Sequence, residues 1–303
     1  MQTNPTNERA GGSLIAEIGT ISIRTSNLDD AIHNAVNMLG LTLTGEGRNS
    51  AYLAAEQGRH HELVYTSDKT DSLDHIGLVA RDAEAMRTIH SRVSALGMEI
   101  VSTNSLADGV EEAFSFVGPG GFTFEIYRGM TAGGVIQHSG GFGPDRYGHI
   151  NIHPQDVVGM KDFLVDVLGF YVSDVIGKDF AYFLRCNAEH HGIALIKGQG
   201  TIHHHAWQTQ SLADLGRLAD RLDASGRHLI WGPVRHGAGH NMAAYFEDTS
   251  GMVIELYCDM EHIYDELRDP VYWSDDDHRW FNRWMGDFRP EVFRGYGIGP
   301  TRR

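Results

Sequence analysis

The chain has 303 residues, of which 41% are hydrophobic and 21% charged, as in a globular protein with a substantial core. The formal net charge of −15 speaks against nucleic acid or an anionic membrane surface as a partner. Two cysteines, Cys186 and Cys258, are too few for a disulfide framework or a thiolate metal site, and they suit a reducing cytoplasm.

The first thirteen residues are mostly polar and predict a disordered tail. They lack the apolar core that a signal peptide would have. Further along the chain, no apolar run approaches the roughly 18 residues needed to cross a bilayer. We therefore expect a cytoplasmic protein whose ordered part begins near residue 14.

The chain repeats itself at an offset of about 129 residues. The segment Glu17–Ile23 resembles Arg146–Ile152, and four landmarks pair in register: Thr20 with His149, Gly40 with Gly169, His75 with His204, and Glu125 with Glu255. Such a repeat predicts two similar modules, over 14–130 and 145–260. The glycine-rich stretch 131–145 predicts a linker, and 261–303 is a separate C-terminal extension rich in aromatic residues.

The second module has the clearer pattern of elements. Apolar residues at helical spacing predict a helix over 157–168, between a cap at Asp156 and a stop at Gly169, and another over 212–222 before Gly226. Short apolar or alternating stretches predict strands over 147–152, 170–176, 180–186, 191–196, 203–209, 228–231, 242–247 and 252–257. The predicted fold class is α+β, with two βαβββ units in each of two tandem modules.

Three candidate metal ligands, His149, His204 and Glu255, lie on three different predicted strands of the second module. Two imidazoles and one carboxylate on one face of an octahedral ion leave three positions open, which suits non-heme Fe(II) and is also accepted by Mn(II). Neutral imidazoles and an ionised carboxylate leave an Fe(II) site with a net charge near +1, which favours an anionic catecholate.

The choice among three consecutive histidines rests on strand geometry and on the repeat. Neighbours on a strand point to opposite faces, so only one of His204 and His205 can face the metal. The pairing of His75 with His204 in the repeat selects His204. In the first module Thr20 stands where His149 stands in the second, so we expect His75 and Glu125 to be structural remnants that bind no metal.

At these residues the second module resembles the catalytic module of the type I extradiol catechol dioxygenases, in the vicinal oxygen chelate superfamily. The resemblance covers about 145–260 strongly and the first module more weakly. The segments that carry it are Tyr147-Gly-His149, His203-His-His-Ala-Trp207, Gly232-Pro-Val-Arg-His-Gly-Ala-Gly-His240, Tyr245-Phe-Glu-Asp-Thr-Ser-Gly251 and Gly251-Met-Val-Ile-Glu-Leu-Tyr257.

The resemblance implies a vicinal oxygen chelate, glyoxalase-like fold and an enzyme of aromatic compound degradation that cleaves a catechol with O2 at Fe(II), beside the diol. It implies that His191 stabilises bound oxygen and serves as an acid, and that His236 and Tyr245 hydrogen-bond the bound diol. His240 also matches a family position, where it could serve the substrate directly or support other side chains. The ring substituent and the choice between iron and manganese stay open.

Two other functions stay open beside ring cleavage. A glyoxalase-like isomerase or thiol transferase would use a different ligand set, commonly built across two modules, and Thr20 speaks against it. A non-catalytic binding protein for an aromatic compound would not need His191, His236 and Tyr245 together. The aromatic extension predicts either a subunit contact, as in a homo-oligomer, or a lid over the pocket.

Overall fold

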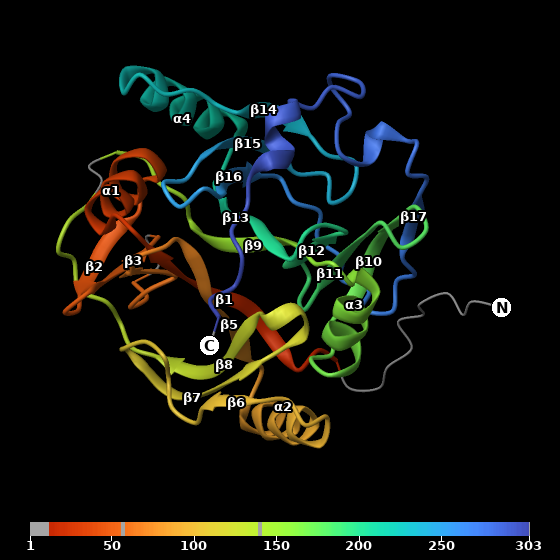
Figure 1. Ribbon diagram of the computed structural model, residues 1–303. Helices are drawn as coiled ribbons and strands as arrows, with labels where there is room; N and C mark the ends of the chain where they lie inside the picture. The colour runs from red at the N-terminus through yellow and green to blue at the C-terminus, as the bar shows by residue number, and fades with distance from the viewer. Residues whose placement is uncertain (1–11, 56–57, 139–140, 303) are drawn as a thin grey trace.

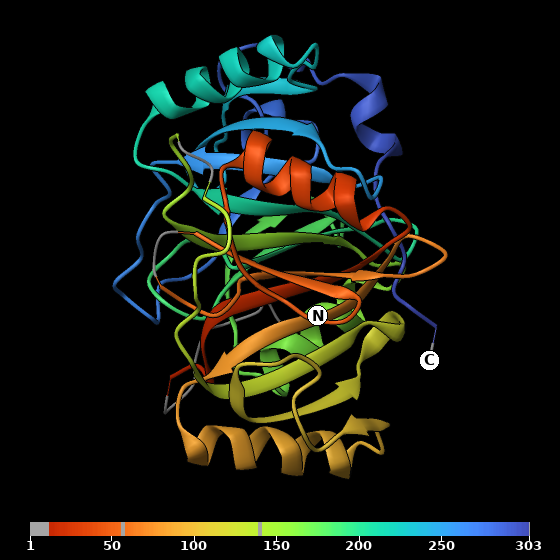
Figure 2. The ribbon, with the colours of Figure 1, turned by 90° about the vertical axis from the view of Figure 1, so that its left-hand side faces the viewer.

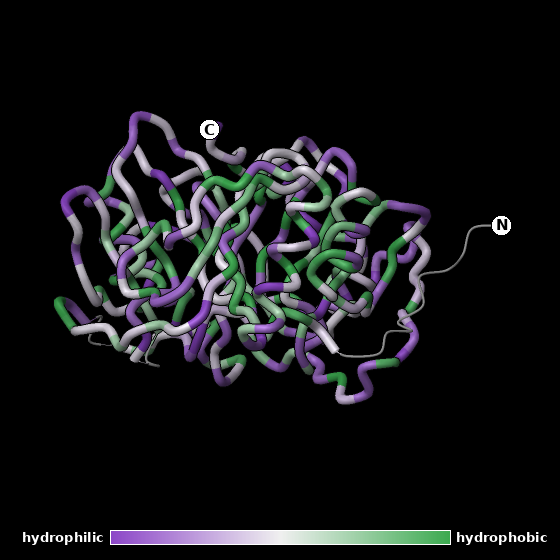
Figure 3. The backbone as a smooth tube through the Cα atoms, turned by 90° about the horizontal axis from the view of Figure 1, so that it is seen from below, coloured by the Kyte–Doolittle hydropathy of each residue, from purple (hydrophilic) through white to green (hydrophobic). Residues whose placement is uncertain are grey.

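Two large mixed β-sheets form the body of the protein in the computed structural model, which describes residues 12–55, 58–138 and 141–302. They lie against each other, with helices α2 and α4 on opposite outer sides (Figures 1 and 2). Hydrophobic segments run through the central strands, while the peripheral loops are largely polar (Figure 3). The predicted tail falls mainly on residues 1–11, which lie outside the described residues.

The first sheet has eight strands in the order β2-β3-β4-β1-β5-β8-β7-β6. Its strands are β1 (Ile15–Thr25), β2 (Thr42–Glu46), β3 (Ser50–Ala54), β4 (Leu63–Ser67), β5 (Ser72–Ala80), β6 (Ile100–Ser102), β7 (Val110–Val117) and β8 (Thr123–Met130). The helices that accompany it are α1 (Leu28–His33), the π-helical turn η1 (Asn34–Leu39) and α2 (Ala83–Ala95).

The second sheet has nine strands in the order β14-β15-β16-β13-β9-β12-β11-β10-β17. They are β9 (Arg146–His153), β10 (Tyr171–Ile176), β11 (Ala181–Arg185), β12 (Ile193–Ile196), β13 (Thr201–Gln208), β14 (Trp231–Arg235), β15 (Met242–Glu247), β16 (Val253–Cys258) and β17 (Val271–Trp273). Helices α3 (Val157–Asp166) and α4 (Leu212–Ala224) belong to it, and the mixed α+β class is confirmed.

The internal repeat extends to the pairing of individual residues. In the first sheet β1 runs antiparallel to β5, with Thr20 opposite Gly77 and Ser22 opposite His75. In the second sheet β9 and β13 pair in the same register, with His149 opposite Ala206 and Asn151 opposite His204. The strands that run parallel to β5 and β13 also correspond. Gly77 on β5 pairs with Glu125 on β8, and Ala206 on β13 pairs with Glu255 on β16.

A close contact between a glycine and a tyrosine occurs once in each sheet. A Cβ atom on Gly19 would lie 2.1 Å from the hydroxyl of Tyr127, and a Cβ atom on Gly148 would lie 2.1 Å from the hydroxyl of Tyr257. Only glycine allows the tyrosine ring to pack so closely on the first strand of the sheet. In the second sheet this ring also packs against His149, at 4.8 Å between ring centroids.

The predicted elements of the second module are largely confirmed, with Asp156 as the N-cap of α3. The strand expected over 228–231 is wrong in position, because β14 spans Trp231–Arg235 and includes Pro233. Proline lacks the N–H that an inner strand needs, but β14 lies at the edge of the sheet, where a strand tolerates it. Strand β12 begins at Ile193, so His191 lies in the loop that precedes it.

The C-terminal extension is integrated into the fold. Strand β17 adds to the edge of the second sheet by pairing in parallel with β10, and two short 3-10 helices follow, η3 (His278–Trp280) and η4 (Glu291–Gly295). The last described residues return to both sheets, since Ile298 bridges to Ile202 and Pro300 bridges to Leu73. No helix of the described residues is long and apolar enough to cross a membrane.

Candidate metal centre

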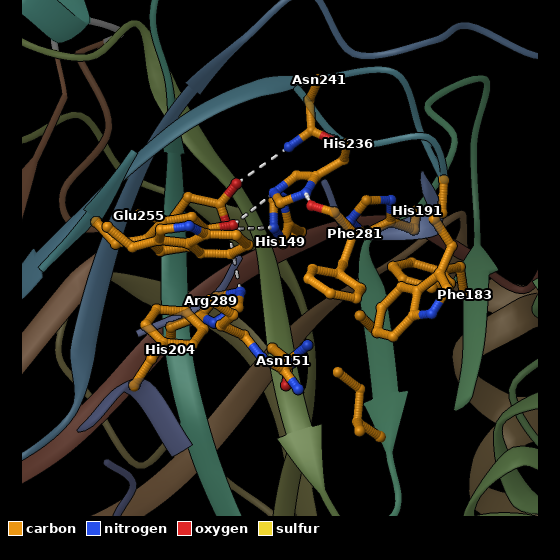
Figure 4. Close-up of a pocket in the computed structure, with 17 residues that line it drawn as sticks. His149, Asn151, Phe183, His191, His204, His236, Asn241, Glu255, Phe281 and Arg289 are labelled. Carbon is orange, nitrogen blue, oxygen red and sulfur yellow. Dashed lines mark hydrogen bonds and ion pairs between the residues drawn. The ribbon is translucent and has the colours of Figure 1, made fainter. Parts of the chain in front are cut away.

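Three neighbouring strands bring His149, His204 and Glu255 together in a buried cluster (Figure 4). Their ligand atoms all lie within 4.8 Å of one another. The Nε2 atoms of His149 and His204 lie 3.2 Å and 3.1 Å from the same carboxylate oxygen, Oε2 of Glu255. The exposed fractions of the three residues are 2%, 6% and 1%, respectively. The strand pairing therefore aims two imidazoles and one carboxylate at one point.

The other two histidines of the triple sequence make different contacts. Nδ1 of His205 accepts a hydrogen bond from the indole Nε1 of Trp207 at 2.9 Å, and its ring is fully buried. Nε2 of His203 donates to the carbonyl oxygen of Phe293 at 2.7 Å. The structure thus places His204, and not His205, beside Glu255.

Electrostatics favours a bound cation at this cluster. Burial by itself raises the pKa of Glu255, but the two imidazoles outweigh it and hold the pKa well below its usual range. Burial lowers the pKa of His204 more than Glu255 raises it, so its imidazole is neutral. An ionised carboxylate that is buried beside a neutral imidazole is costly in a protein interior unless a cation compensates its charge. The donor set fits a divalent metal ion that leaves positions open toward a cavity.

The carboxylate of Glu255 has a further partner that the sequence did not reveal. Nδ2 of Asn241 donates to Oε1 of Glu255 at 3.1 Å, and Asn241 is almost fully buried. This bond fixes the carboxylate so that Oε2 faces the two imidazoles. Asn241 directly follows the motif Gly232–His240, and this position next to the motif is the only feature of the sequence that could have indicated its role.

The corresponding residues of the first sheet have structural contacts instead. His75 Nε2 lies 3.7 Å from Glu125 Oε2, and its Nδ1 lies 2.7 Å from Asp74. Oε1 of Glu125 accepts hydrogen bonds from the backbone of Leu106 at 2.6 Å and from the hydroxyl of Ser105 at 3.2 Å. Within the described ranges the cluster in the second sheet is the only one that joins three metal-ligating side chains.

A network of hydrogen bonds orients His191 at the cavity. Trp273 donates to Asp174 Oδ2 at 2.6 Å, and Asp174 Oδ1 accepts from His190 Nε2 at 2.9 Å. In the neutral form of His190 with its proton on Nε2, Nδ1 accepts from Nδ1 of His191 at 3.0 Å. The tautomer of His191 is thereby set, with Nε2 as a proton acceptor. Burial lowers the pKa of His191 well below its usual value, so the ring is neutral at rest.

His236 and Tyr245 form a second oriented pair on the wall of the cavity. The backbone oxygen of Phe281 can only accept, so Nδ1 of His236 donates to it at 2.5 Å. In the neutral ring Nε2 then accepts from the hydroxyl of Tyr245 at 2.7 Å. Burial raises the pKa of Tyr245 well above its usual value, so the phenol keeps its proton. His240, by contrast, is exposed and does not line the cavity.

The cavity combines this polar face with an aromatic and aliphatic face. Its apolar lining residues are Phe183, Ala194, Ile196, Trp231, Ala238, Trp280, Phe281 and Phe293. Three of them, together with Arg289, come from the C-terminal extension, which therefore forms part of the cavity wall. Trp284 and Phe288 of the same extension stay exposed, at 51% and 55%.

Comparisons with known proteins agree with this geometry. Residues 146–256 match the family model of the Glyoxalase/Bleomycin resistance protein/Dioxygenase superfamily. The chain is 31% identical over 240 residues to the biphenyl-2,3-diol 1,2-dioxygenase of Paraburkholderia xenovorans (strain LB400), covering 72% of this chain and 78% of that protein. It is 25% identical to the manganese-dependent 2,3-dihydroxybiphenyl 1,2-dioxygenase of Geobacillus genomosp. 3, covering 95% of this chain and 98% of that protein.

Among solved structures, the Mn(II)-bound glyoxalase from Novosphingobium aromaticivorans is similar with a TM-score of 0.85 and 28% identity. The match covers 95% of this chain and 96% of that one.

We predict that Glu255→Ala loses tight binding of Fe(II) or Mn(II), because the variant lacks the only anionic ligand and the two remaining imidazoles bind the ion weakly. Asn241→Ala should weaken binding by roughly 10–100-fold, the usual cost of losing a group that orients a ligand. The measurement is anaerobic metal titration of the folded variants by calorimetry, with total metal analysis. His75→Ala is the matched control in the first sheet and should bind metal like the wild type. Stoichiometric metal in Glu255→Ala, or an empty site in His75→Ala, would refute the assignment.

Proposed function

The chain belongs to the Glyoxalase/Bleomycin resistance protein/Dioxygenase superfamily, and on that premise we propose that it is an extradiol ring-cleaving dioxygenase. The reaction inserts both atoms of O2 into a catechol-type substrate and opens the ring beside the diol. One observation carries the proposal: the two imidazoles and the carboxylate meet at a cavity that His191, His236 and Tyr245 also line.

His149, His204 and Glu255 would hold a single Fe(II) or Mn(II) ion, with Asn241 orienting the carboxylate. When bound, such an ion supplies the open coordination positions at which a diol and O2 can be brought together. The protein contributes a fixed geometry, since all three ligands stand on strands of one sheet. The aromatic wall of the cavity packs against the substrate ring and excludes water from it.

His236 and Tyr245 are proposed to bind the hydroxyl groups of the substrate. In the resting site the proton of Tyr245 points to Nε2 of His236. A proton that the diol releases on binding can be taken up by His236, whose Nε2 then donates to Tyr245. The phenol proton turns toward the substrate oxygen, where a hydrogen bond in a dry pocket stabilises negative charge.

His191 is proposed to carry a proton during ring cleavage. Its Nε2 starts as an acceptor because the link through His190 to Asp174 holds the proton on Nδ1. It can therefore act as an acid only after it has taken a proton. The ring lies 4.5 Å from that of His149, between centroids, so any proton it holds is close to the proposed metal centre.

The two other functions are less well supported by the same residues. A glyoxalase-like isomerase or transferase remains compatible with the fold, and the glyoxalase neighbour favours it as the second candidate. The ligand set, however, lies within one sheet, and the first sheet has no equivalent cluster in its described residues. A binding protein without activity would leave unexplained why the orienting networks of His191 and His236 converge on the cavity.

We further propose that the enzyme acts in the cytoplasm as a homo-oligomer. Large apolar side chains of the extension stay exposed and could be covered by another subunit: Tyr264, Leu267, Val271, Tyr272, Trp284 and Phe288.

The proposed function is tested by anaerobic reconstitution with Fe(II) or Mn(II), followed by oxygen uptake on a panel of catechols. We expect uptake of one O2 per catechol consumed, with the appearance of a coloured ring-opened product. A parallel assay with a glutathione hemithioacetal tests the glyoxalase alternative. Turnover of the hemithioacetal without catechol cleavage would refute the dioxygenase, and catechol binding without any turnover would favour the binding protein.

His191→Phe should keep metal content and anaerobic catechol affinity near the wild-type values, because it removes no metal ligand. Turnover should fall by roughly 10²–10⁴-fold, the range that general acid–base groups contribute. Unchanged binding with slower turnover is the signature of an interaction made after the ground state. The exposed His240 offers a control, and His240→Asn should turn over normally. If His191→Phe cleaves catechols at the wild-type rate, His191 has a structural role only.

A further inference from the structure

Arg289 is a cationic side chain at the junction of two cavities. It lines the inner cavity together with His204 and Glu255, and it also lines a neighbouring outer cavity. Asn151 and His204 are shared by the two cavities in the same way. Figure 4 shows Arg289 near His204 and Asn151, on the side of Glu255 away from Asn241. The guanidinium therefore stands where a substituent of a substrate would leave the inner cavity.

The guanidinium of Arg289 has no carboxylate partner among the residues that the structure describes. Its Nε atom is buried and makes no hydrogen bond. The acidic side chain on the wall of the inner cavity is Glu255, which already accepts from Asn241 and contacts two imidazoles. The Phe281 ring stacks against Arg289, with the guanidinium carbon 4.9 Å from the ring centroid. Burial, assisted by Arg294, lowers the pKa of Arg289 to about 10, which leaves it charged at neutral pH.

Cations also gather around the outer cavity. Its lining includes Lys197, Arg289 and Arg294 and no acidic side chain, although the whole chain has a formal net charge of −15. A separate surface hollow that Arg289 also borders is lined by four acidic residues, none of which forms an ion pair with Arg289: Asp275, Asp276, Asp287 and Glu291. A hollow lined by one sign of charge concentrates ligands of the opposite sign.

A buried amide accompanies the guanidinium at the junction. Asn151 is only 4% exposed, and its Oδ1 atom is buried without a hydrogen-bond partner. A buried donor without a partner costs free energy, and a ligand atom that accepts from Nε of Arg289 would recover it. Oδ1 of Asn151 is an acceptor, so it would take a donor of the ligand, such as a hydroxyl group, and not the carboxylate. The planar fork of an arginine matches a carboxylate in particular, with two parallel N–H donors.

We propose that Arg289 binds a carboxylate on the ring substituent of the substrate, so that the substrate class is an anionic, carboxylated catechol. This inference rests on the proposed function, and it names the substrate class of the same site. The diol occupies the inner end of the cavity beside His149, His204 and Glu255, the ring packs between the aromatic walls, and the carboxylate reaches Arg289. Lys197 and Arg294 attract the anion to the outer cavity.

The test compares two catechols of the same shape that differ in charge. The anionic probe is 3,4-dihydroxyphenylacetate, and the neutral probe is 4-isobutylcatechol, in which a methyl group replaces each carboxylate oxygen. Affinity is measured by anaerobic titration of the metal-loaded protein, and kcat/KM by oxygen uptake. The variants are Arg289→Gln and Arg289→Lys, with Arg283→Gln as a control that removes an exposed charge from the same extension.

We expect Arg289→Gln to lose roughly 10–100-fold in affinity and in kcat/KM for the anionic probe, the usual worth of a hydrogen bond to a charged group. The neutral probe should change by less than about threefold, Arg289→Lys should lose less than Arg289→Gln, and Arg283→Gln should match the wild type. Equal losses for both probes, or no loss for the anion, would overturn the inference while catechol cleavage still stood. Wild-type protein that cleaves neither these probes nor any other catechol of the panel would refute the proposed function itself, whereas cleavage of neutral catechols alone would overturn only the inference about Arg289.

If Arg289→Gln does not fold, the inference can still be tested on the wild-type protein by varying the salt concentration. Its preference for the anionic over the neutral probe should shrink as ionic strength rises, because salt screens a partly exposed charge pair. A preference that is absent at low salt would overturn the inference.

Discussion

The burial of the Glu255 carboxylate is the constraint on which the rest of the site depends. An ionised carboxylate with an exposed fraction of 1% is costly unless a cation or several donors compensate it. Asn241 supplies one donor, and the imidazoles of His149 and His204 approach the other oxygen. A divalent ion at this point would satisfy all three side chains at once. The three strands β9, β13 and β16 hold the ligands in place without needing any loop to move.

The repeated architecture explains why one sheet carries the chemistry and the other does not. Both sheets pair their central strands in the same register, so equivalent positions meet in space. In the first sheet Thr20 replaces the first imidazole, and Glu125 is bound by the loop around Ser105 and Leu106. The second sheet is instead covered by the aromatic extension, which closes its cavity and adds Arg289. One fold thus serves as a scaffold in one half and as a reactive site in the other.

Much of the site could be predicted from the sequence because the repeat and the strand alternation are local signals. Together they selected His149, His204 over His205, and Glu255, which the structure brings together. The position of β14 could not be predicted, since a proline is tolerated only at a sheet edge and edges are set by the whole topology. Asn241 lies just before β15 and donates a hydrogen bond to Glu255 on the neighbouring strand β16. Arg289 reaches the cavity from a segment without regular periodicity. Such contacts depend on tertiary packing, which leaves no pattern along the chain.

Ring cleavage at this site is expected to insert both atoms of O2 into the ring of a catechol. The most direct measurement is a single turnover of the Fe(II)-loaded protein under ¹⁸O2, followed by mass spectrometry of the ring-opened product. We expect two ¹⁸O atoms in each product molecule, apart from any label that exchanges with water at an aldehyde or carboxylate. A product opened next to the diol that carries one labelled atom or none, after correction for such exchange, would contradict this expectation.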